Sequence, residues 1–223
     1  MKAMILAAGF GKRLLPVTES IPKPLLKIGN ETLIQRNIKL LIESGYSEII
    51  INVSHLGHLI KEHVEETFPG KDISFSFEEK PLGTGGGILK ALPLLGDECF
   101  LVINADIFHN IKLTGLLNNV EAAHLIGVPN PNHNIDGDFN IRNNLVTVGS
   151  NSNNLTWSGL SIINPVIFKD NSFKTNSFNM WNAVLSKYIN KNLVTGEISS
   201  ELWLDVGTPE RLKLANSVYN DEN

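Results

Sequence analysis

The sequence predicts a single α/β domain with a mostly parallel, mixed central sheet and helices on both faces. The first observation is an alternation of short apolar runs, typical of buried strands, with segments of helical periodicity. Apolar runs lie at residues 3–8, 49–53 and 100–103, and residues 73–77 predict a further strand because apolar and polar side chains alternate there. The second observation is a change after residue 120 to strand-like segments broken by Asn, Pro and Gly. The alternation favours parallel pairing, and the later segments predict further strands that include a hairpin.

The composition supports a folded protein of one domain. The chain has 223 residues, of which 42% are hydrophobic and 19% charged, enough to bury a substantial core. The net charge is −4 and no basic block is present, which argues against a nucleic-acid partner. The one cysteine, Cys99, lies in an apolar run, so we expect a buried, inert thiol and no internal disulfide.

No segment of the sequence suggests a membrane span or a secretion signal. The N-terminal apolar run is too short for either, and no later run reaches the length needed to span a bilayer. We therefore expect a cytoplasmic protein without a membrane partner. The sequence leaves the oligomeric state open between a monomer and a small homo-oligomer.

Three helices are predicted between the first four strands. Thr32 is expected to cap a helix whose apolar residues recur at helical spacing and which ends at Gly45. Ser54 is expected to cap the second helix, at residues 55–67. Its three histidines have no Cys partner, so solvated or locally hydrogen-bonded side chains are favoured over a metal site. The third helix follows a glycine cluster at residues 83–87 and continues through Leu92.

The turn after the first strand carries the pattern of a phosphate site. Two glycines in Gly9–Arg13 allow a sharp turn and close approach of a ligand, and Lys12 and Arg13 add cationic donors. Lys23 follows, held between two prolines. The turn is not a dinucleotide fingerprint, because Leu14 stands where that motif has its third glycine, nor a Walker loop, because an arginine replaces its Ser or Thr. Backbone amides, an arginine and a rigidly placed lysine together suit a triphosphate.

These residues resemble the signature of the sugar-phosphate nucleotidyltransferases, which make NDP-sugars from an NTP and a sugar 1-phosphate. The matching residues are Leu6-Ala7-Ala8-Gly9-x-Gly11-x-Arg13-Leu14-x-Pro16-x-Thr18 and Pro22-Lys23-Pro24-Leu25. The resemblance covers nearly the whole chain and implies the Rossmann-like nucleotidyltransferase fold. It also implies that the first loop, the following lysine and the glycine-rich turn bind the NTP. The expected nucleotide-binding residues are Ala8, Gly9, Phe10, Gly11, Lys12, Arg13, Lys23, Thr84 and Gly85.

Two aspartates follow predicted strands, and each alone suits an ordinary turn or helix cap. Asp106 stands at the carboxyl end of the fourth strand, where open α/β sheets bind ligands. Asp205 lies in a Trp-x-Asp-x-Gly-Thr motif, after which a helix begins. The resemblance implies that Asp106 and Asp205 hold Mg²⁺, with Arg13 and Lys23 beside the phosphates. We therefore expect Arg13, Lys23 and Asp106 to be the catalytic residues.

The second half of the chain is expected to bind the sugar phosphate. Its predicted elements are a hairpin at residues 137–141 and 145–148, a strand at 156–163 and a helix at 179–191. We interpret residues 1–120 as the nucleotide-binding half and residues 121–223 as the sugar-binding half of one domain. The expected sugar-binding residues are Asn104, Gly137, Asp138, Ser158 and Gly159.

The resemblance implies a direct transfer, in which an oxygen of the sugar 1-phosphate attacks the α-phosphorus of the NTP and pyrophosphate leaves. Positioning and charge neutralisation suffice for this chemistry, which agrees with the absence of a Ser or Cys nucleophile motif. UTP is the favoured nucleotide, with GTP and dTTP as alternatives. Three other functions stay open: a mannose or glucose 1-phosphate nucleotidyltransferase, a phosphocholine-type cytidylyltransferase, and a nucleotide-sensing subunit without catalysis. A dehydrogenase is disfavoured by the missing third glycine.

Overall fold

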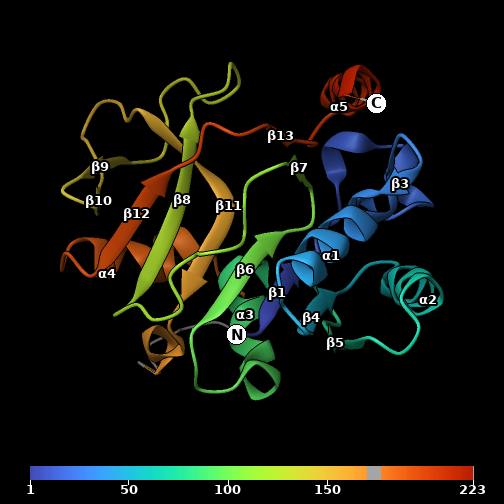
Figure 1. The fold of residues 1–223 in the computed structure, drawn as a ribbon, viewed down its shortest axis with the longest axis horizontal. Helices are drawn as coiled ribbons and strands as arrows, with labels where there is room; N and C mark the ends of the chain where they lie inside the picture. Colours follow the sequence, from blue (N-terminus) through green and yellow to red (C-terminus); the bar gives the residue numbers. More distant parts are fainter. Residues whose placement is uncertain (170–176, 223) are drawn as a thin grey trace.

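The computed structural model describes residues 1–169 and 177–222, and Figure 1 shows a central sheet with helices packed around it. The sheet has nine strands in the order β5-β4-β1-β6-β11-β8-β12-β10-β9. Their bounds in chain order are β1 (Ala3–Leu6), β4 (Glu48–Val53), β5 (Asp72–Phe77), β6 (Phe100–Asn104), β8 (Ala123–Pro129), β9 (Asn140–Arg142), β10 (Leu145–Thr147), β11 (Leu155–Ile163) and β12 (Val194–Ile198).

The pairing confirms a mixed sheet in which most strands share one direction. β5, β4, β1 and β6 are parallel neighbours, and they are the first four strands predicted from the sequence. β11 is antiparallel to both β6 and β8, whereas β12 is parallel to β8. β10 is antiparallel to β12 and β9. Within the nine-stranded sheet, β11 and β10 therefore oppose the direction of the other strands. The carboxyl ends of β1, β4, β5 and β6 meet at one edge, where ligands bind in open α/β sheets.

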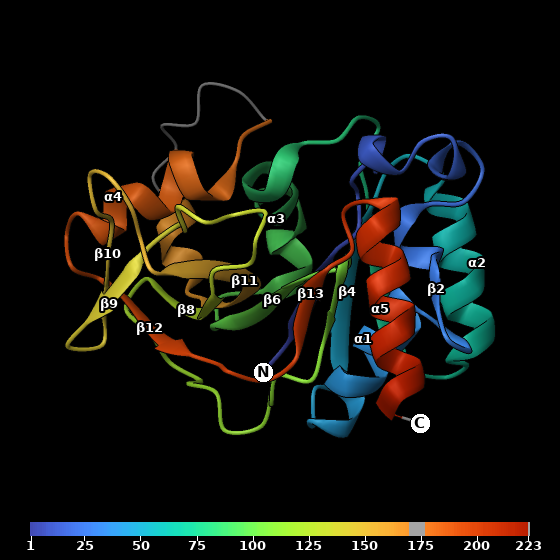
Figure 2. The same cartoon turned by 90° about the horizontal axis from the view of Figure 1, so that it is seen from above.

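Helices cover both faces of the sheet, as predicted. Successive side chains of a strand point to opposite faces, so Ala3 and Ile5 join one core cluster and Met4 joins another. The first cluster contains residues of α1 (Leu33–Glu43) and α2 (Gly57–Thr67). The second contains residues of α3 (Gly83–Leu95) and of the helical segment that ends in α4 (Ser186–Ile189). Figure 2 shows α3 and α4 on one side of the sheet and α1 on the other.

The starts of the first two helices differ in how well the sequence predicted them. Thr32 caps α1 as expected, because its hydroxyl accepts a hydrogen bond from the amide of Gln35 at 3.2 Å. The predicted start of the second helix at residue 55 is wrong, and Ser54 is not its cap. Leu56 adopts a left-handed conformation with φ 54°, so the helix begins at Gly57.

The second half confirms the hairpin and the long strand but modifies the predicted helix. β9 and β10 pair around Asn143 and Asn144, whose φ angles of 50° and 64° match a two-residue hairpin turn. The segment expected to form a helix at 179–191 contains a π-helix at Trp181–Leu185 that leads into α4. Cys99 is buried as predicted.

The last segment of the chain returns to the first half. β13 (Trp203–Asp205) pairs with β7 (Ile107–His109), and α5 (Pro209–Glu222) follows. A third core cluster joins residues of α5 to N-terminal residues such as Leu14 and Leu26. Figure 1 shows α5 beside the hairpin of β2 (Lys27–Ile28) and β3 (Glu31–Thr32). The short 3₁₀ helices are Lys12–Leu14, Val17–Glu19, Lys23–Leu25 and Pro165–Phe168. No helix within 1–169 and 177–222 is long and apolar enough to cross a membrane.

Candidate active site

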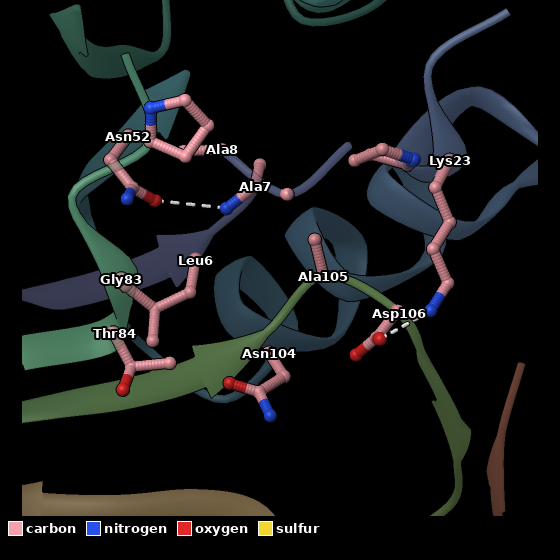
Figure 3. A pocket seen from close by; sticks show the side chains of 13 residues that line it. Leu6, Ala7, Ala8, Lys23, Asn52, Gly83, Thr84, Asn104, Ala105 and Asp106 are labelled. Atoms are coloured by element: carbon pink, nitrogen blue, oxygen red, sulfur yellow. Dashed lines mark hydrogen bonds and ion pairs between the residues drawn. The ribbon is translucent and has the colours of Figure 1, made fainter. Parts of the chain in front are cut away.

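Two adjoining cavities lie at the carboxyl ends of the central strands. The first has a volume of about 230 Å³ and is shown in Figure 3. It is lined by Leu6, Ala7, Ala8, Gly9, Lys23, Pro24, Asn52, Pro81, Gly83, Thr84, Asn104, Ala105 and Asp106. The second has a volume of about 320 Å³ and is lined by Asn104, Asp106, Ile107, His133, Asn134, Asp138, Thr156, Trp157, Ser158, Trp203 and Asp205. Asn104 and Asp106 line both, so the two cavities meet at the end of β6.

The first cavity has one charged end and one neutral end. Lys23 and Asp106 form an ion pair, and Figure 3 shows them together at one end of the cavity. Gly83 and Thr84, at the start of α3, lie at the opposite end. The ammonium group of Lys23 is placed by a short 3₁₀ helix that begins between the two prolines, and the residue is only 9% exposed. This polarity suits a nucleotide whose phosphates lie toward Lys23 and whose base lies toward α3.

The pairing of β7 with β13 brings together two aspartates that are distant in the sequence. Asp205 lies opposite Ile107, the residue after Asp106, and the amide of Val206 donates to the carbonyl of Asp106 at 2.9 Å. Both aspartates line the second cavity. The structure therefore brings together Asp106, Asp205 and Lys23, three residues expected to act in one site.

Basic side chains surround Asp205. Its Oδ2 lies 3.3 Å from Nη2 of Arg211 and 3.6 Å from Nε2 of His133. Burial, followed by the charges of Arg211 and Arg13, lowers the pKa of His133, while Asp205 acts in the opposite direction. The buried Oδ1 of Asp205 has no hydrogen-bond partner among the described residues. That oxygen can therefore coordinate a cation.

The residues fit a magnesium site in which substrate supplies part of the coordination shell. No group of three or more His, Cys, Asp or Glu side chains in the described ranges could hold a metal by itself. Mg²⁺ usually binds proteins through one or two carboxylates and takes its remaining ligands from water and substrate phosphates. Asp106 and Asp205 at the wall of one cavity, with a free carboxylate oxygen on Asp205, match that pattern.

Several predicted nucleotide-binding residues lie outside the lining of both cavities. The ring of Phe10 lies 5.2 Å from that of His55, and Nζ of Lys12 lies 5.9 Å from the Phe10 ring. Gly11 has φ 64°, and a Cβ there would come within 2.9 Å of Thr18, so this glycine shapes the turn. The guanidinium of Arg13 reaches Gly207, where an added Cβ would lie 2.9 Å from Nη2. Arg13 is therefore near Asp205.

Gly85 also lies outside the cavities, and this changes what its substitution is expected to do. A Cβ at Gly85 would lie 2.4 Å from Cε2 of Phe178, whereas a Cβ at Gly9, in the first cavity, would meet nothing within 4 Å. We expect Gly85→Val to overpack this contact and lower the free energy of unfolding by about 1–3 kcal/mol. Gly9→Val should keep its melting temperature and lose the thermal shift that we expect from UTP. Thermal melts with and without nucleotide measure both effects, and an unchanged melting temperature for Gly85→Val would contradict this packing.

Only some of the predicted sugar-binding residues line the second cavity. Asp138 lines the second cavity, where its carboxylate accepts hydrogen bonds from the amide of Trp157 at 2.8 Å and from Asn134 at 3.2 Å. The Ser158 hydroxyl is already used, because it donates to the carbonyl of Ile126 and accepts from an amide. Gly137 and Gly159 are outside the lining. An added Cβ at Gly159 would lie 2.6 Å from the Asn104 amide, so this glycine leaves room for that side chain.

Other residues of the site were not predicted from the sequence. Asn52 lines the first cavity and stands near the end of β4, so the rule that pointed to Asp106 also applies to it. His133, Asn134 and Trp203 line the second cavity. No local sequence signal marks His133 and Asn134 as lining residues, because their place in the cavity depends on where their loop lies relative to β6 and β13.

Comparisons with known proteins agree with this fold. The profile of the family described as Nucleotidyl transferase matches residues 2–129. The N-acetylmuramate alpha-1-phosphate uridylyltransferase of Neisseria meningitidis serogroup B is 37% identical over 229 residues, which cover 98% of each chain. A D-glycero-alpha-D-manno-heptose 1-phosphate guanylyltransferase of Campylobacter jejuni is 37% identical over 52% of each chain. The structure of HddC from Yersinia pseudotuberculosis complexed with GMP-PN has a TM-score of 0.82 and 25% identity, over 98% of this chain and 99% of that one.

The chain therefore belongs to the nucleotidyl transferase family, and it is a sugar-1-phosphate nucleotidyltransferase. Its similarity to the Neisseria uridylyltransferase extends over both halves, including the region after residue 129 that the family profile does not cover. That second region supplies most of the lining of the second cavity.

Proposed function

We propose that the protein transfers the uridylyl group of UTP to N-acetylmuramate 1-phosphate, in a Mg²⁺-dependent reaction of cell-wall sugar recycling. The observation that carries the proposal is the pair of cavities that meet at Asp106, one with the Lys23 ion pair and the other with Asp205. The similarity over 98% of both chains to a uridylyltransferase of that name supports the choice of substrates.

In the proposed reaction, a phosphate oxygen of the sugar 1-phosphate in the second cavity attacks the α-phosphorus of UTP in the first. The bond from that phosphorus to the pyrophosphate oxygen breaks, and pyrophosphate leaves. Asp106 and Asp205 would hold Mg²⁺, and the ion would supply charge neutralisation and orientation of the phosphates. Lys23 offsets charge on the reacting phosphates, and Arg13 binds the leaving pyrophosphate. No protein nucleophile is needed, because each substrate enters from its own side of Asp106.

The charges of the second cavity are relevant to the acceptor. N-acetylmuramate 1-phosphate carries a carboxylate on its lactyl group in addition to its phosphate, yet Asp106, Asp138 and Asp205 line this cavity. Basic groups must offset that repulsion. Arg211 and His133 lie beside Asp205, and His133 itself lines the cavity. The guanidinium of Arg211 offsets the charge of Asp205, and the ring N–H of His133, whose pKa is lowered, can donate a hydrogen bond to an acidic sugar phosphate.

A guanylyltransferase is the second candidate. The Campylobacter relative is named as a guanylyltransferase, and the Yersinia structure was solved with a guanine nucleotide analogue. A pyrophosphate-release screen separates the candidates by combining each of the four NTPs with the 1-phosphates of N-acetylmuramate, N-acetylglucosamine, glucose and mannose. We expect the highest kcat/KM for UTP with N-acetylmuramate 1-phosphate. A preference for GTP or for a neutral sugar would overturn the proposed substrates.

Asp138→Ala tests the second cavity as the acceptor site. We expect the KM for the sugar 1-phosphate to rise about tenfold or more, while the KM for UTP stays within about twofold, because the variant removes a half-buried acceptor from the cavity wall and leaves the Trp157 amide without its partner. Asp136→Ala is a matched control, since Asp136 is exposed in the same loop and lies outside the cavity lining. Steady-state kinetics with each substrate varied gives both constants. An equal rise in both would assign Asp138 to the fold alone.

A further inference from the structure

We infer that Glu78 and Asn52 are a positioning pair that holds the base end and the phosphate end of the nucleotide cavity in register. The inference rests on the proposed function, because it concerns the alignment of a nucleotide bound in the first cavity. Neither residue performs a chemical step. Both act through the backbone segments that they connect.

Three hydrogen bonds join the two ends of the cavity. The amide of Leu82, in the turn before α3, donates to Oε2 of Glu78 at 2.8 Å. The side-chain amide of Asn52 donates to Oε1 of the same carboxylate at 2.7 Å. Asn52 Oδ1 then accepts from the backbone amide of Ala7 at 2.8 Å, a bond that Figure 3 shows. A continuous chain of bonds therefore runs from the base-side turn to the start of the phosphate loop.

The chain of bonds crosses neighbouring strands at their carboxyl ends. Glu78 follows β5, Asn52 lies near the end of β4, and Ala7 follows β1. These strands are adjacent and parallel in the sheet. The amide of Glu78 also donates to the carbonyl of Val53 at 2.8 Å, which continues the pairing beyond β5. The pair therefore fixes the edge of the sheet from which both ends of the cavity arise.

Both side chains of the pair are almost completely buried, which makes a charged carboxylate there energetically costly. Glu78 is 5% exposed and Asn52 is 2% exposed. Among the described residues, no Lys, Arg or His forms an ion pair with Glu78. A buried carboxylate without a cation is unfavourable unless hydrogen bonds stabilise it. Its two bonds go to groups that must be aligned for a nucleotide to bind, and the reaction makes no other use of this charge.

The helix that carries the base-side turn is fitted closely to the pair. A Cβ at Gly87, in the first turns of α3, would lie 2.6 Å from Nδ2 of Asn52 and 2.7 Å from Oε1 of Glu78. The glycine lets the helix approach the two side chains directly. The position of α3 and the position of the pair are thus mutually dependent, as expected for an alignment element.

The direction of each hydrogen bond is fixed, which makes a conservative variant informative. The Ala7 amide requires Oδ1 of Asn52 as its acceptor, so Nδ2 must face Glu78. The Leu82 amide also donates to Glu78. A carboxylate accepts both bonds, whereas the amide of a glutamine would place its own donor against one of these two donors. Glu78→Gln therefore breaks the chain of bonds with almost no change in size.

The experiment compares ligands that span the cavity with ligands that fill one end. Titration calorimetry measures UTP and inorganic triphosphate, and ligand-observed NMR measures uridine. We expect Glu78→Gln to weaken UTP binding by about tenfold or more, with inorganic triphosphate and uridine each within about twofold of wild type. If the substrate screen selects another NTP, that NTP and its nucleoside replace UTP and uridine. Glu79→Gln is the matched control, because Glu79 is exposed and lies outside the first cavity.

The outcomes separate the inference from the proposed function. UTP binding within twofold of wild type in Glu78→Gln would overturn the inference while leaving the proposed function intact. Equal loss of all three ligands, together with a lower melting temperature, would also overturn it by assigning Glu78 to the fold. A wild-type protein that binds no NTP would overturn the proposed function itself.

A measurement on the wild-type protein tests the inference even if Glu78→Gln fails to fold. UTP spans both ends of the cavity, and we expect saturating UTP to slow hydrogen exchange of the Leu82 amide at least about fivefold more than saturating uridine does, because Glu78 and Asn52 connect this amide to the phosphate end. Equal protection of Leu82 by UTP and by uridine would overturn the inference.

Discussion

Asp106→Asn and Asp205→Asn should each reduce nucleotidyl transfer by at least about a hundredfold, because each removes one proposed Mg²⁺ ligand. The two carboxylates line one cavity and face several phosphate charges when both substrates are bound. Without a cation between them, they would repel both substrates. Activity should also be lost in EDTA and return with excess Mg²⁺. Steady-state rates over a series of Mg²⁺ concentrations, with calorimetric titration of Mg²⁺ in the presence of UTP, provide the test.

The control for these variants is Asp97→Asn, an exposed position outside both cavities, which should match wild type. Asp106→Asn also weakens the ion pair with Lys23, so a modest fall in melting temperature is expected for that variant. Full activity in EDTA, or normal turnover of Asp205→Asn, would show that these carboxylates do not act through a metal ion.

Lys23→Ala should lower kcat/KM by about a hundredfold or more, with the larger part of the loss in kcat. Lys23 is 9% exposed and supplies the cationic group that lines the first cavity within the described residues. Its removal takes away a charge that interacts more strongly with the transition state than with bound UTP. It also leaves the Asp106 carboxylate without its ion-pair partner. Steady-state kinetics with UTP and sugar 1-phosphate, each varied at saturation of the other, separates kcat from KM.

Lys71→Ala removes an exposed lysine outside both cavities and should leave kinetics unchanged. Circular dichroism and thermal melts establish that Lys23→Ala is folded at the assay temperature. A rise in KM for UTP with kcat unchanged would assign Lys23 to ground-state binding of the triphosphate and contradict a role in the transfer step.

Much of the nucleotide half could be predicted from local sequence. The segments that form β1, β4, β5 and β6 carry their strand character in neighbouring residues, and the cap at Thr32 depends on a contact three residues away. Asp106 was predicted because a residue that follows a parallel strand has a known place in such a sheet, and Lys23 was predicted from the glycine turn before it and its two flanking prolines. Ser54 failed as a helix cap because the chain makes an additional turn at Leu56 before α2 begins.

The relations between distant segments were decided by tertiary structure. The pairing of β7 with β13 places Asp205 beside Asp106, and nothing in either segment alone specifies that partner. Gly85 packs under Phe178 instead of lining the cavity, because α3 is oriented by contacts with the segment after residue 176. The bonds from Leu82 through Glu78 and Asn52 to Ala7 exist only once β5, β4 and β1 lie side by side. Periodicity and capping act over a few residues and can be read locally, whereas these contacts depend on how the whole chain packs.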